Sequence, residues 1–399
     1  MPEADISPAD GLPALAALPT ADDASTNNTA ALLAKTAVLK LNGGLGTSMG
    51  LEKAKSLLEV KDGHTFLDLI ALQVASLRAR YSPAQVRFVL MDSFATSADT
   101  RALLEAKHSE LIKSDPQGWE LLQNKSPKVA RESLEPASFA SNPELEWCPP
   151  GHGDIYPSLL GSGMLDKLLG EGVEYLFVSN SDNLGATLDL ALLRHFAERA
   201  AGAGGESGSN GLAFLMEVCE RTAADKKGGH LAVRKSDGKF VLRESAMCPG
   251  EFASSFCFCC SARSLSPSRR LLFLGASAPR TALFFTRQKK HHHHQNNQTD
   301  ADKPAFEDVT KHRYFNTNNL WVHLPSLKKE LEKHGGFLPL PLIKNAKTVD
   351  PRDSASAPVY QLETAMGSGE CVRIKRFFSF SARGVGAAGE KKTRAPPRD

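Results

Sequence analysis

The chain has 399 residues, of which 41% are hydrophobic and 23% are charged, and its formal net charge is +3. This composition is typical of a soluble globular protein with enough apolar side chains for one large domain or two ordinary ones. A charge so close to neutral gives no support for a nucleic-acid partner, and without a run of about 18 apolar residues we expect no membrane span. The seven cysteines are odd in number and lack zinc-finger spacing, which favours a reducing, cytoplasmic location.

The first third of the chain predicts strands that alternate with helices. Residues 1–30 are rich in Ala, Pro and Asp without a period, and we expect a mobile tail there. An apolar run at 36–41 stops at glycines, which predicts a buried strand followed by a Gly-rich turn. Apolar residues at helical spacing predict a helix over 66–80, and a second strand follows at 86–91. A polar helix is expected to begin near Asp99.

The same alternation continues toward the middle of the chain. A third strand is predicted over 174–180, a helix over 188–200 and a fourth strand over 211–218. This order of elements favours an α/β fold whose mostly parallel central sheet is covered on both faces. Ligands of such sheets bind outside the carboxyl ends of the strands, so the residues that follow the strands are candidates for a site.

Two segments lack helical or strand periodicity. Residues 250–300 combine a Ser- and Cys-rich stretch, a basic patch and four consecutive histidines at 291–294. Residues 368–399 are basic and rich in Ser and Gly. Such low-complexity sequence predicts disorder in both segments, with the folded domain over 31–249 and 301–367. Because no ordered ligand set surrounds the four histidines, we predict no metal site there.

The glycine-rich turn after the first strand is the sharpest motif. Residues 41–50 have the sequence LNGGLGTSMG, and Lys55 follows. The spacing fits neither a P-loop nor the GxGxxG dinucleotide fingerprint. Glycines after a strand let backbone amides approach an anionic group closely, and a nearby lysine supplies a compact cation. Although a lysine alone is most often a solvated surface residue, this context predicts that Lys55 binds phosphate.

This turn and the EKAKSLLEVKDGHTFLDL segment after it resemble the nucleotide-binding signature of eukaryotic UTP–glucose-1-phosphate uridylyltransferases. Asn42 before the glycine pair and Ser48 after Thr47 are more similar to the glucose-1-phosphate enzymes than to the N-acetylhexosamine enzymes. The resemblance implies that Lys55 is a catalytic cation that meets the UTP phosphates. It also implies nucleotide contacts from Leu41, Asn42, Gly43 and Gly44.

Two further blocks match the same family in order. The QNKSPK block that begins at Gln123 is similar to the family's Q-x-x-x-P-[KR] segment, whose glutamine contacts uracil. Residues 147–156, WCPPGHGDIY, are similar to its W-x-P-P-G-H-G-D-I-Y loop. The resemblance implies that Gly151 approaches the nucleotide and that His152 meets the sugar phosphate. Taken alone, a histidine between two glycines is equally compatible with a simple turn, although imidazole is a good donor to a phosphate oxygen.

Residues 178–187, VSNSDNLGAT, resemble the strand-end block whose aspartate, here Asp182, holds Mg²⁺ beside the substrate. An aspartate at the end of a buried strand offers hard oxygen ligands to Mg²⁺, whereas an isolated one is more often a turn or capping residue. The resemblance implies that Asn180 contacts the sugar phosphate. Matching blocks at 226–230, 243–246, 315–321 and 361–366 lie around the sugar pocket in the family. From them we expect substrate contacts by Glu244, Asn316 and Asn318, although asparagine clusters are more often turns.

The resemblance covers about residues 32–249 and 301–367 and implies a Rossmann-like, GT-A-like nucleotidyltransferase domain with a mixed, mostly parallel sheet. The implied reaction is the Mg²⁺-dependent transfer of UMP from UTP to glucose 1-phosphate, which gives UDP-glucose and pyrophosphate. The family continues with a second lysine-bearing segment and a β-helix domain, and this sequence contains neither. Two alternatives therefore stay open: a UDP-sugar pyrophosphorylase of broader specificity, and a nucleotide-binding remnant with impaired catalysis.

Overall fold

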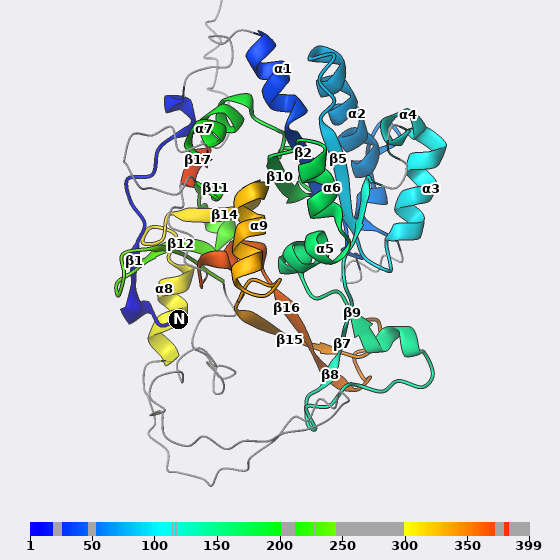
Figure 1. The fold of residues 1–399 in the computed structure, drawn as a ribbon. Helices are drawn as coiled ribbons and strands as arrows, with labels where there is room; N and C mark the ends of the chain where they lie inside the picture. Colours follow the sequence, from blue (N-terminus) through cyan, green and yellow to red (C-terminus); the bar gives the residue numbers. More distant parts are fainter. Residues whose placement is uncertain are drawn as a thin grey trace, which may run out of the picture.

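The computed structural model folds the chain around a ten-stranded sheet with helices on both faces (Figure 1). It describes residues 1–18, 26–46, 53–113, 115, 118–200, 212–226, 228–244, 299–371 and 379–382. The expected disordered segments, 250–300 and 368–399, fall mostly outside this part of the chain and stay predictions there. Where they enter it, the chain forms regular elements and not the expected disorder: residues 299–300 begin helix α8 (Thr299–Glu307), residues 368–371 continue a 3₁₀ helix (Met366–Cys371), and residues 379–382 form strand β17 (Ser379–Ala382).

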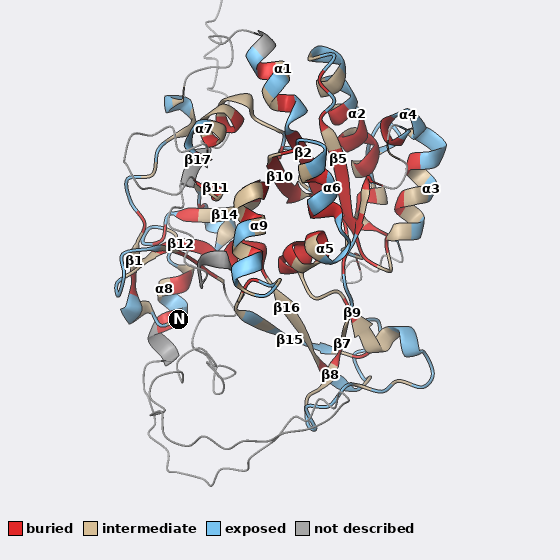
Figure 2. Ribbon diagram, in the orientation of Figure 1, coloured by how far each residue is buried: buried red, intermediate tan, exposed pale blue. Residues whose placement is uncertain are grey.

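Four neighbouring strands of the sheet are parallel, and three of them are buried. Their order is β10–β2–β5–β6, and they span Tyr175–Asn180, Thr36–Leu41, Arg87–Asp92 and Glu120–Leu122. The first three confirm the strands predicted at 174–180, 36–41 and 86–91 to within one residue. Their near-continuous apolar sequence follows from burial on both faces (Figure 2), because helices cover a parallel sheet on each side.

The other half of the sheet is largely antiparallel, which corrects the expectation of a mostly parallel sheet. Strand β14 (Tyr314–His323) runs antiparallel between β10 and β11 (Phe214–Glu220), and β17 (Ser379–Ala382) pairs with β11. β12 (His230–Arg234) forms an antiparallel hairpin with β13 (Phe240–Arg243). Parallel strands need a crossover connection, usually a helix, whereas antiparallel strands can be joined by a short hairpin. The expectation of a mostly parallel sheet came from strands that alternate with helices, and this half of the sheet lacks that alternation.

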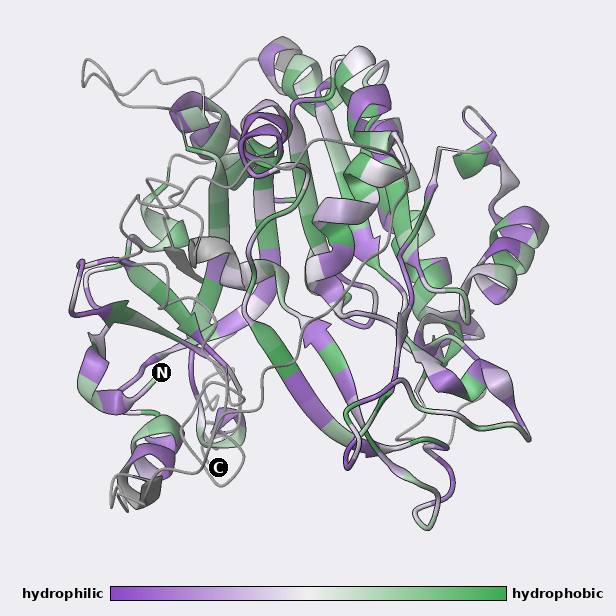
Figure 3. Ribbon diagram, turned by 60° about the horizontal axis from the view of Figure 1, so that its bottom comes forward, coloured by the Kyte–Doolittle hydropathy of each residue, from purple (hydrophilic) through white to green (hydrophobic). Residues whose placement is uncertain are grey.

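Helices form a layer on each face of the sheet. One layer contains α1 (Thr26–Ala34), α2 (Phe66–Arg80), α3 (Ser97–Lys107), α4 (Ser109–Ile112) and α7 (Leu190–Ala200), and the other contains α5 (Ile155–Gly161), α6 (Met164–Gly170) and α9 (Leu324–Lys333). Ile70 of α2 packs in one cluster with Phe88, and Leu165 of α6 packs in another with Leu39. Figure 3 shows apolar residues concentrated on the strands between these layers. In the described ranges, no helix is both long and apolar enough to cross a membrane.

Helix α2 begins where its sequence supplies a cap. The Thr65 hydroxyl accepts a hydrogen bond from the Asp68 backbone N–H at 3.1 Å, and Asp68 Oδ2 accepts one from the Thr65 backbone N–H at 2.9 Å. This capping box satisfies two donors that the first turn of a helix leaves free. The fixed start directs Ile70 and Val74 into the core and leaves Gln73 to reach the backbone oxygen of Leu184 at 3.1 Å.

Smaller sheets extend from one end of the large sheet (Figure 1). β15 (Leu342–Thr348), β16 (Pro358–Thr364) and β8 (Val129–Ala130) form one antiparallel sheet. Two-stranded pairs are formed by β7 (Ser126–Pro127) with β9 (Trp147–Cys148) and by β3 (Glu59–Lys61) with β4 (His64–Thr65). The first two of these sheets join segments that are distant in sequence, and they supply the wall opposite the parallel strands.

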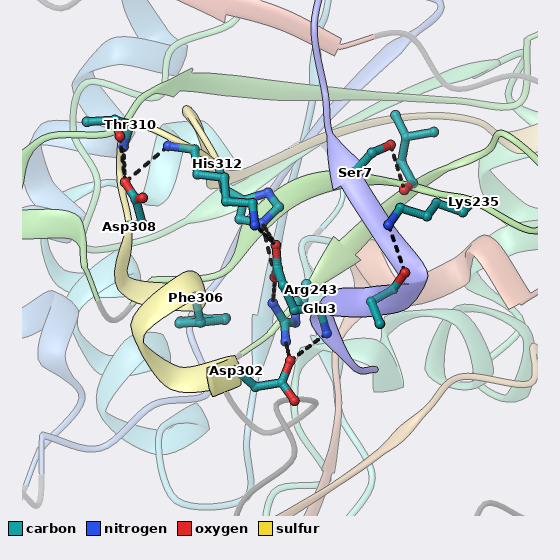
Figure 4. Close-up of polar contacts among 12 residues, drawn as sticks. Glu3, Ser7, Lys235, Arg243, Asp302, Phe306, Asp308, Thr310 and His312 are labelled. Atoms are coloured by element: carbon teal, nitrogen blue, oxygen red, sulfur yellow. Dashed lines mark hydrogen bonds and ion pairs between the residues drawn. The ribbon is translucent and has the colours of Figure 1, made fainter. Parts of the chain in front are cut away.

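Residues 1–18 are docked on the sheet and residues 26–30 belong to helix α1, so the mobile tail expected over 1–30 is wrong for both parts. Strand β1 (Ile6–Pro8) pairs antiparallel with β12, and Ile6 is only 2% exposed. The Glu3 carboxylate lies 2.6 Å from the buried guanidinium of Arg243 and 3.0 Å from His312 Nε2 (Figure 4). Because a buried charge needs a partner, this ion pair attaches the N-terminal segment to the end of β13.

We expect Glu3→Ala to lower the free energy of unfolding by roughly 1–3 kcal/mol, because it leaves buried donors of Arg243 and His312 without an acceptor. Burial by itself raises the pKa of Glu3, but hydrogen bonds from Lys311 and His312 hold the pKa below its usual value of 4.5. A depressed pKa stabilises the fold above the pKa of the unfolded chain. The difference between variant and wild type should therefore shrink as the pH falls below 4.5.

Urea titrations at neutral and acidic pH measure both effects. Asp5→Ala is the matched control, since Asp5 lies in the same 3₁₀ turn (Glu3–Asp5) with an exposed side chain. The control should unfold like wild type at neutral pH. Equal losses in the two variants would show that the ion pair does not hold this segment.

Candidate functional site

A cavity of about 540 Å³ opens at the carboxyl ends of the four parallel strands. The residues that end or follow these strands enter its lining: Leu41, Gly43, Gly44, Met91, Ser93, Phe94, Ala95, Gln123, Asn180, Ser181 and Asp182. The opposite wall contains Gln361 and Glu363 of β16 and several residues between 144 and 152. Parallel neighbours bring loops that are far apart in sequence to one edge of the sheet, which is where such sheets bind ligands.

The glycine-rich turn brings Gly43 against Gln123. A Cβ atom built on Gly43 would lie 2.0 Å from Gln123 Nε2, so any larger residue displaces that side chain. The backbone N–H of Asn42 donates to Met91 O, and that of Gln123 donates to Asp92 O, each at 2.8 Å. Two residues with separately predicted nucleotide contacts are thus held side by side at the end of β5. Residues 47–50 of the motif lie outside the described part of the chain.

Asn42 lies beneath the turn and supports it from below. It is buried, and its Nδ2 donates to Asp92 Oδ1 at 2.7 Å and to Thr100 Oγ1 at 2.9 Å. Burial raises the pKa of Asp92 to about 7, although hydrogen bonds from Asn42 and Thr100 act in the opposite direction. None of the sequence motifs predicts a role for Asp92. Its position at the end of an apolar strand could have indicated this role, because a buried carboxylate must find hydrogen-bond partners.

Lys55 and Asp182 lie next to each other in the cavity lining. Lys55 Nζ lies 3.8 Å from Asp182 Oδ2, and the two side chains are 36% and 45% exposed. The backbone N–H of Lys55 donates to Gly44 O at 3.3 Å, which holds the lysine beside the glycine-rich turn. A half-exposed ion pair at this distance contributes little to stability. Both side chains can therefore turn to a bound phosphate group or cation at small cost.

Gly151 and His152 lie where the 147–156 loop meets β16. Gly151 has φ +83°, and a Cβ atom there would lie 2.6 Å from the backbone oxygen of Thr364, so this position requires glycine. The backbone N–H of Met366 donates to His152 Nδ1 at 3.1 Å, which leaves the proton of the neutral ring on Nε2. Burial lowers the pKa of His152 to about 4, so the imidazole is neutral at neutral pH. A neutral imidazole with its proton on Nε2 is a hydrogen-bond donor to a phosphate oxygen.

The predicted sugar-pocket residues are connected to the cavity by a hydrogen bond to Asn180. Asn318 Nδ2 donates to Asn180 Oδ1 at 2.7 Å, and the Asn318 backbone N–H donates to Asn316 Oδ1 at 2.9 Å. Burial raises the pKa of Glu244, against a hydrogen bond from Asn316. Of these residues, only Asn180 is in the cavity lining; Asn316, Asn318 and Glu244 form a polar cluster behind it. Their predicted contacts with substrate stay predictions.

Asp154 is a further supporting residue whose role the sequence alone did not indicate. Its carboxylate accepts hydrogen bonds from the backbone N–H of Asn124 at 2.7 Å and from Ser158 Oγ at 2.7 Å. It therefore joins the residue after Gln123 to helix α5. The partners come from segments about thirty residues apart, which is why the motif alone did not indicate this role.

The chemistry of Asp182 fits the predicted magnesium ligand. Mg²⁺ is commonly held by one or two carboxylates together with the phosphates of a substrate. Asp182 offers one half-exposed carboxylate that lines the cavity beside the predicted phosphate-binding residues. Within the described ranges, no cluster of three or more His, Cys, Asp or Glu residues could hold a metal ion without substrate.

Known proteins resemble this chain over most of its length. The family described as UTP–glucose-1-phosphate uridylyltransferase matches residues 6–264 and 284–385. A probable UTP–glucose-1-phosphate uridylyltransferase from Schizosaccharomyces pombe is 36% identical over 337 residues, which are 84% of this chain and 53% of that protein. The corresponding enzyme of Musa acuminata is 35% identical over 338 residues, 84% of this chain and 56% of its own. The chain thus spans about half the length of these relatives.

Solved structures share the fold. UDP-glucose phosphorylase from Trypanosoma brucei superposes with a TM-score of 0.74 and 40% identity, over 96% of this chain and 67% of that one. A point mutant of UDP-glucose pyrophosphorylase from Leishmania major, in complex with UDP-glucose, gives a TM-score of 0.72 and 42% identity over the same shares. With the family match over most of the sequence, these similarities show that the chain belongs to the UTP–glucose-1-phosphate uridylyltransferase family.

Proposed function

We propose that this protein transfers UMP from UTP to glucose 1-phosphate and so forms UDP-glucose and pyrophosphate, with Mg²⁺ as cofactor. The observation that carries the proposal is the common cavity that Gly43, Lys55, Gln123, His152 and Asp182 share at the ends of parallel strands. The names of the related enzymes, and the UDP-glucose complex of a related structure, support this substrate pair.

Within this cavity the nucleotide is held at two ends. Gln123 contacts the uracil, and Gly43 beside it leaves room for the Gln123 side chain. The backbone around Gly44 and the ammonium of Lys55 face the phosphates, which need donors and positive charge. Asp182 would hold the Mg²⁺, whose chemistry when bound is to neutralise phosphate charge.

The second substrate approaches from the side of the 147–156 loop. His152 Nε2–H and the Asn180 amide donate to the phosphate of glucose 1-phosphate, one oxygen of which attacks the α-phosphorus of UTP. The bond from the α-phosphorus to the bridging oxygen breaks, and pyrophosphate leaves. No covalent enzyme intermediate is needed, so the protein acts by positioning two anions and by stabilising the charge that develops between them.

Pyrophosphate release from UTP and a panel of sugar 1-phosphates tests the proposal. Turnover with glucose 1-phosphate well above galactose 1-phosphate supports it, and comparable turnover with several sugars favours the broader UDP-sugar pyrophosphorylase. UTP binding without any turnover would instead support the nucleotide-binding remnant. Adding Mg²⁺ to enzyme treated with a chelator tests the cofactor.

Lys55→Ala should weaken UTP binding by more than about tenfold, because a charge-assisted contact with phosphate contributes roughly 1.5–3 kcal/mol. Calorimetric titration with UTP measures the affinity. Lys53→Ala is the matched control, since Lys53 is exposed, lies two residues away and is not in the cavity lining. If both variants bind UTP like wild type, Lys55 is a surface lysine and its assignment is wrong.

Asp182→Asn should abolish Mg²⁺-dependent turnover and leave the fold intact, because the amide keeps the shape of the side chain but loses the anionic ligand. Initial rates across a Mg²⁺ titration, with a thermal melt of each protein, separate the two effects. Asp189→Asn is the control: Asp189 Oδ1 accepts from the Leu192 N–H at 2.9 Å, and asparagine caps a helix equally well. An unaltered Mg²⁺ requirement in Asp182→Asn would place the cation elsewhere.

A further inference from the structure

A lysine lies inside the central strand of the sheet, directly below the cavity. Lys40 on β2 is only 2% exposed, and its neighbours in register are Ser179 of β10 and Leu90 of β5. A buried ammonium group is costly unless it is hydrogen-bonded and electrostatically balanced. An apolar residue at this position would continue the strand pattern at lower cost, so the lysine calls for a specific explanation.

The ammonium group of Lys40 joins β2 to the loop after β10. Its Nζ donates to Ser179 Oγ at 2.8 Å and to the backbone oxygen of Ala186 at 2.7 Å. Burial lowers the pKa of Lys40 to about 8, and the charge of Glu217 offsets part of that effect. Glu217 is itself held by hydrogen bonds from Trp321 Nε1 at 2.7 Å and Asn319 Nδ2 at 3.1 Å. Two strands of the sheet thus support the charge of Lys40.

The loop that Lys40 holds carries Asp182. Within the described part of the chain, three hydrogen bonds join loop 181–186 to strand β2 and helix α2, at the start, middle and end of the loop. Ser181 N donates to Leu41 O at 3.1 Å, Gln73 Nε2 donates to Leu184 O at 3.1 Å, and Lys40 Nζ donates to Ala186 O. Lys40 supplies the last of these and is the charged member of the set. Fixing the backbone on both sides of Asp182 keeps its half-exposed carboxylate in the cavity lining.

We propose that Lys40 is a positioning residue that fixes loop 181–186 and thereby holds the Asp182 carboxylate at the phosphate end of the cavity. The functional part of this inference rests on the uridylyl transfer proposed above. Lys40 lies outside the cavity lining, so it acts through the loop and not by contact with substrate. Ser179 and Ala186, its two acceptors, are equally outside that lining.

Hydrogen exchange on Lys40→Met tests the loop directly. Methionine keeps most of the length of the side chain and removes the donors. We expect the amides of residues 183–187 to exchange about tenfold faster in the variant, the equivalent of losing one hydrogen bond of about 1.4 kcal/mol. Thr36→Val is the matched control, because Thr36 is buried on the same strand and its hydroxyl donates to a backbone oxygen, that of Leu32, away from this loop. That variant should leave exchange in 183–187 unchanged.

The ligand experiments separate positioning from general destabilisation. In Lys40→Met, UTP should bind more weakly and the Mg²⁺ concentration needed for half-maximal turnover should rise. Binding of uridine, which has no phosphates, should stay as in wild type, since Gly43 and Gln123 are held by β5. Weaker binding of uridine and UTP alike would show a general structural defect and overturn the proposal.

The outcomes also separate this inference from the proposed reaction. If the wild-type protein forms no UDP-sugar, the proposed function fails, whereas exchange and UTP binding still decide the role of Lys40. Unchanged exchange in 183–187, or faster exchange with unaltered UTP affinity, overturns the positioning role. If Lys40→Met does not fold, Ser179→Ala replaces it, because Ser179 Oγ helps to direct Nζ to Ala186. Faster exchange confined to 183–187 in Ser179→Ala supports the proposal. Unchanged exchange of these amides in that variant overturns it.

Discussion

The parallel pairing of β2 with β10 on one side and β5 on the other is the constraint on which the site depends. Hydrogen bonds of the sheet place Leu41 opposite Asn180 and Met91, so three strands end at the same level. The loops that follow must then share one edge of the sheet, whatever their distance in sequence. The glycine-rich turn and Asp182 converge for this reason, and Gln123 joins them because β6 pairs in parallel with β5. The helices on both faces keep these strands buried.

Buried polar side chains hold the loops that the strands only bring together. Asn42 with Asp92, Asp154 with Asn124, and Lys40 with Ala186 each join a loop at the cavity to a neighbouring element. Groups of this kind lose hydration when buried, so each is stable only with its hydrogen bonds in place. Lys55 and Asp182 are different, because they remain partly exposed and paired at 3.8 Å. The buried polar residues beneath the cavity therefore have their hydrogen-bonding groups occupied within the protein, whereas Lys55 and Asp182 in its lining can bind ligands.

The opposite wall depends on contacts between distant segments. The backbone N–H of Thr364 donates to Pro150 O at 2.9 Å and that of Met366 to His152 Nδ1 at 3.1 Å, so β16 fixes the loop that carries His152. The same contacts leave no room for a side chain at Gly151. The cavity is therefore built between the edge of the large sheet and a separate small sheet, and the reaction proposed above would bring its two substrates together between them.

The sequence by itself determined the three buried parallel strands, the helix over 66–80 and the family, because these rest on local periodicity and on short motifs in a fixed order. It also indicated which residues follow the strands, and nine of the predicted site residues do line one cavity: Leu41, Gly43, Gly44, Lys55, Gln123, Gly151, His152, Asn180 and Asp182. Only the tertiary structure decided that residues 1–18 are docked, that half of the sheet is antiparallel, and that Asp92 and Lys40 support the site. Lys40 and Ala186 are 146 residues apart, and Glu3 and Arg243 are 240 apart. Such partners are defined by strand order and burial, which no local pattern in the sequence records.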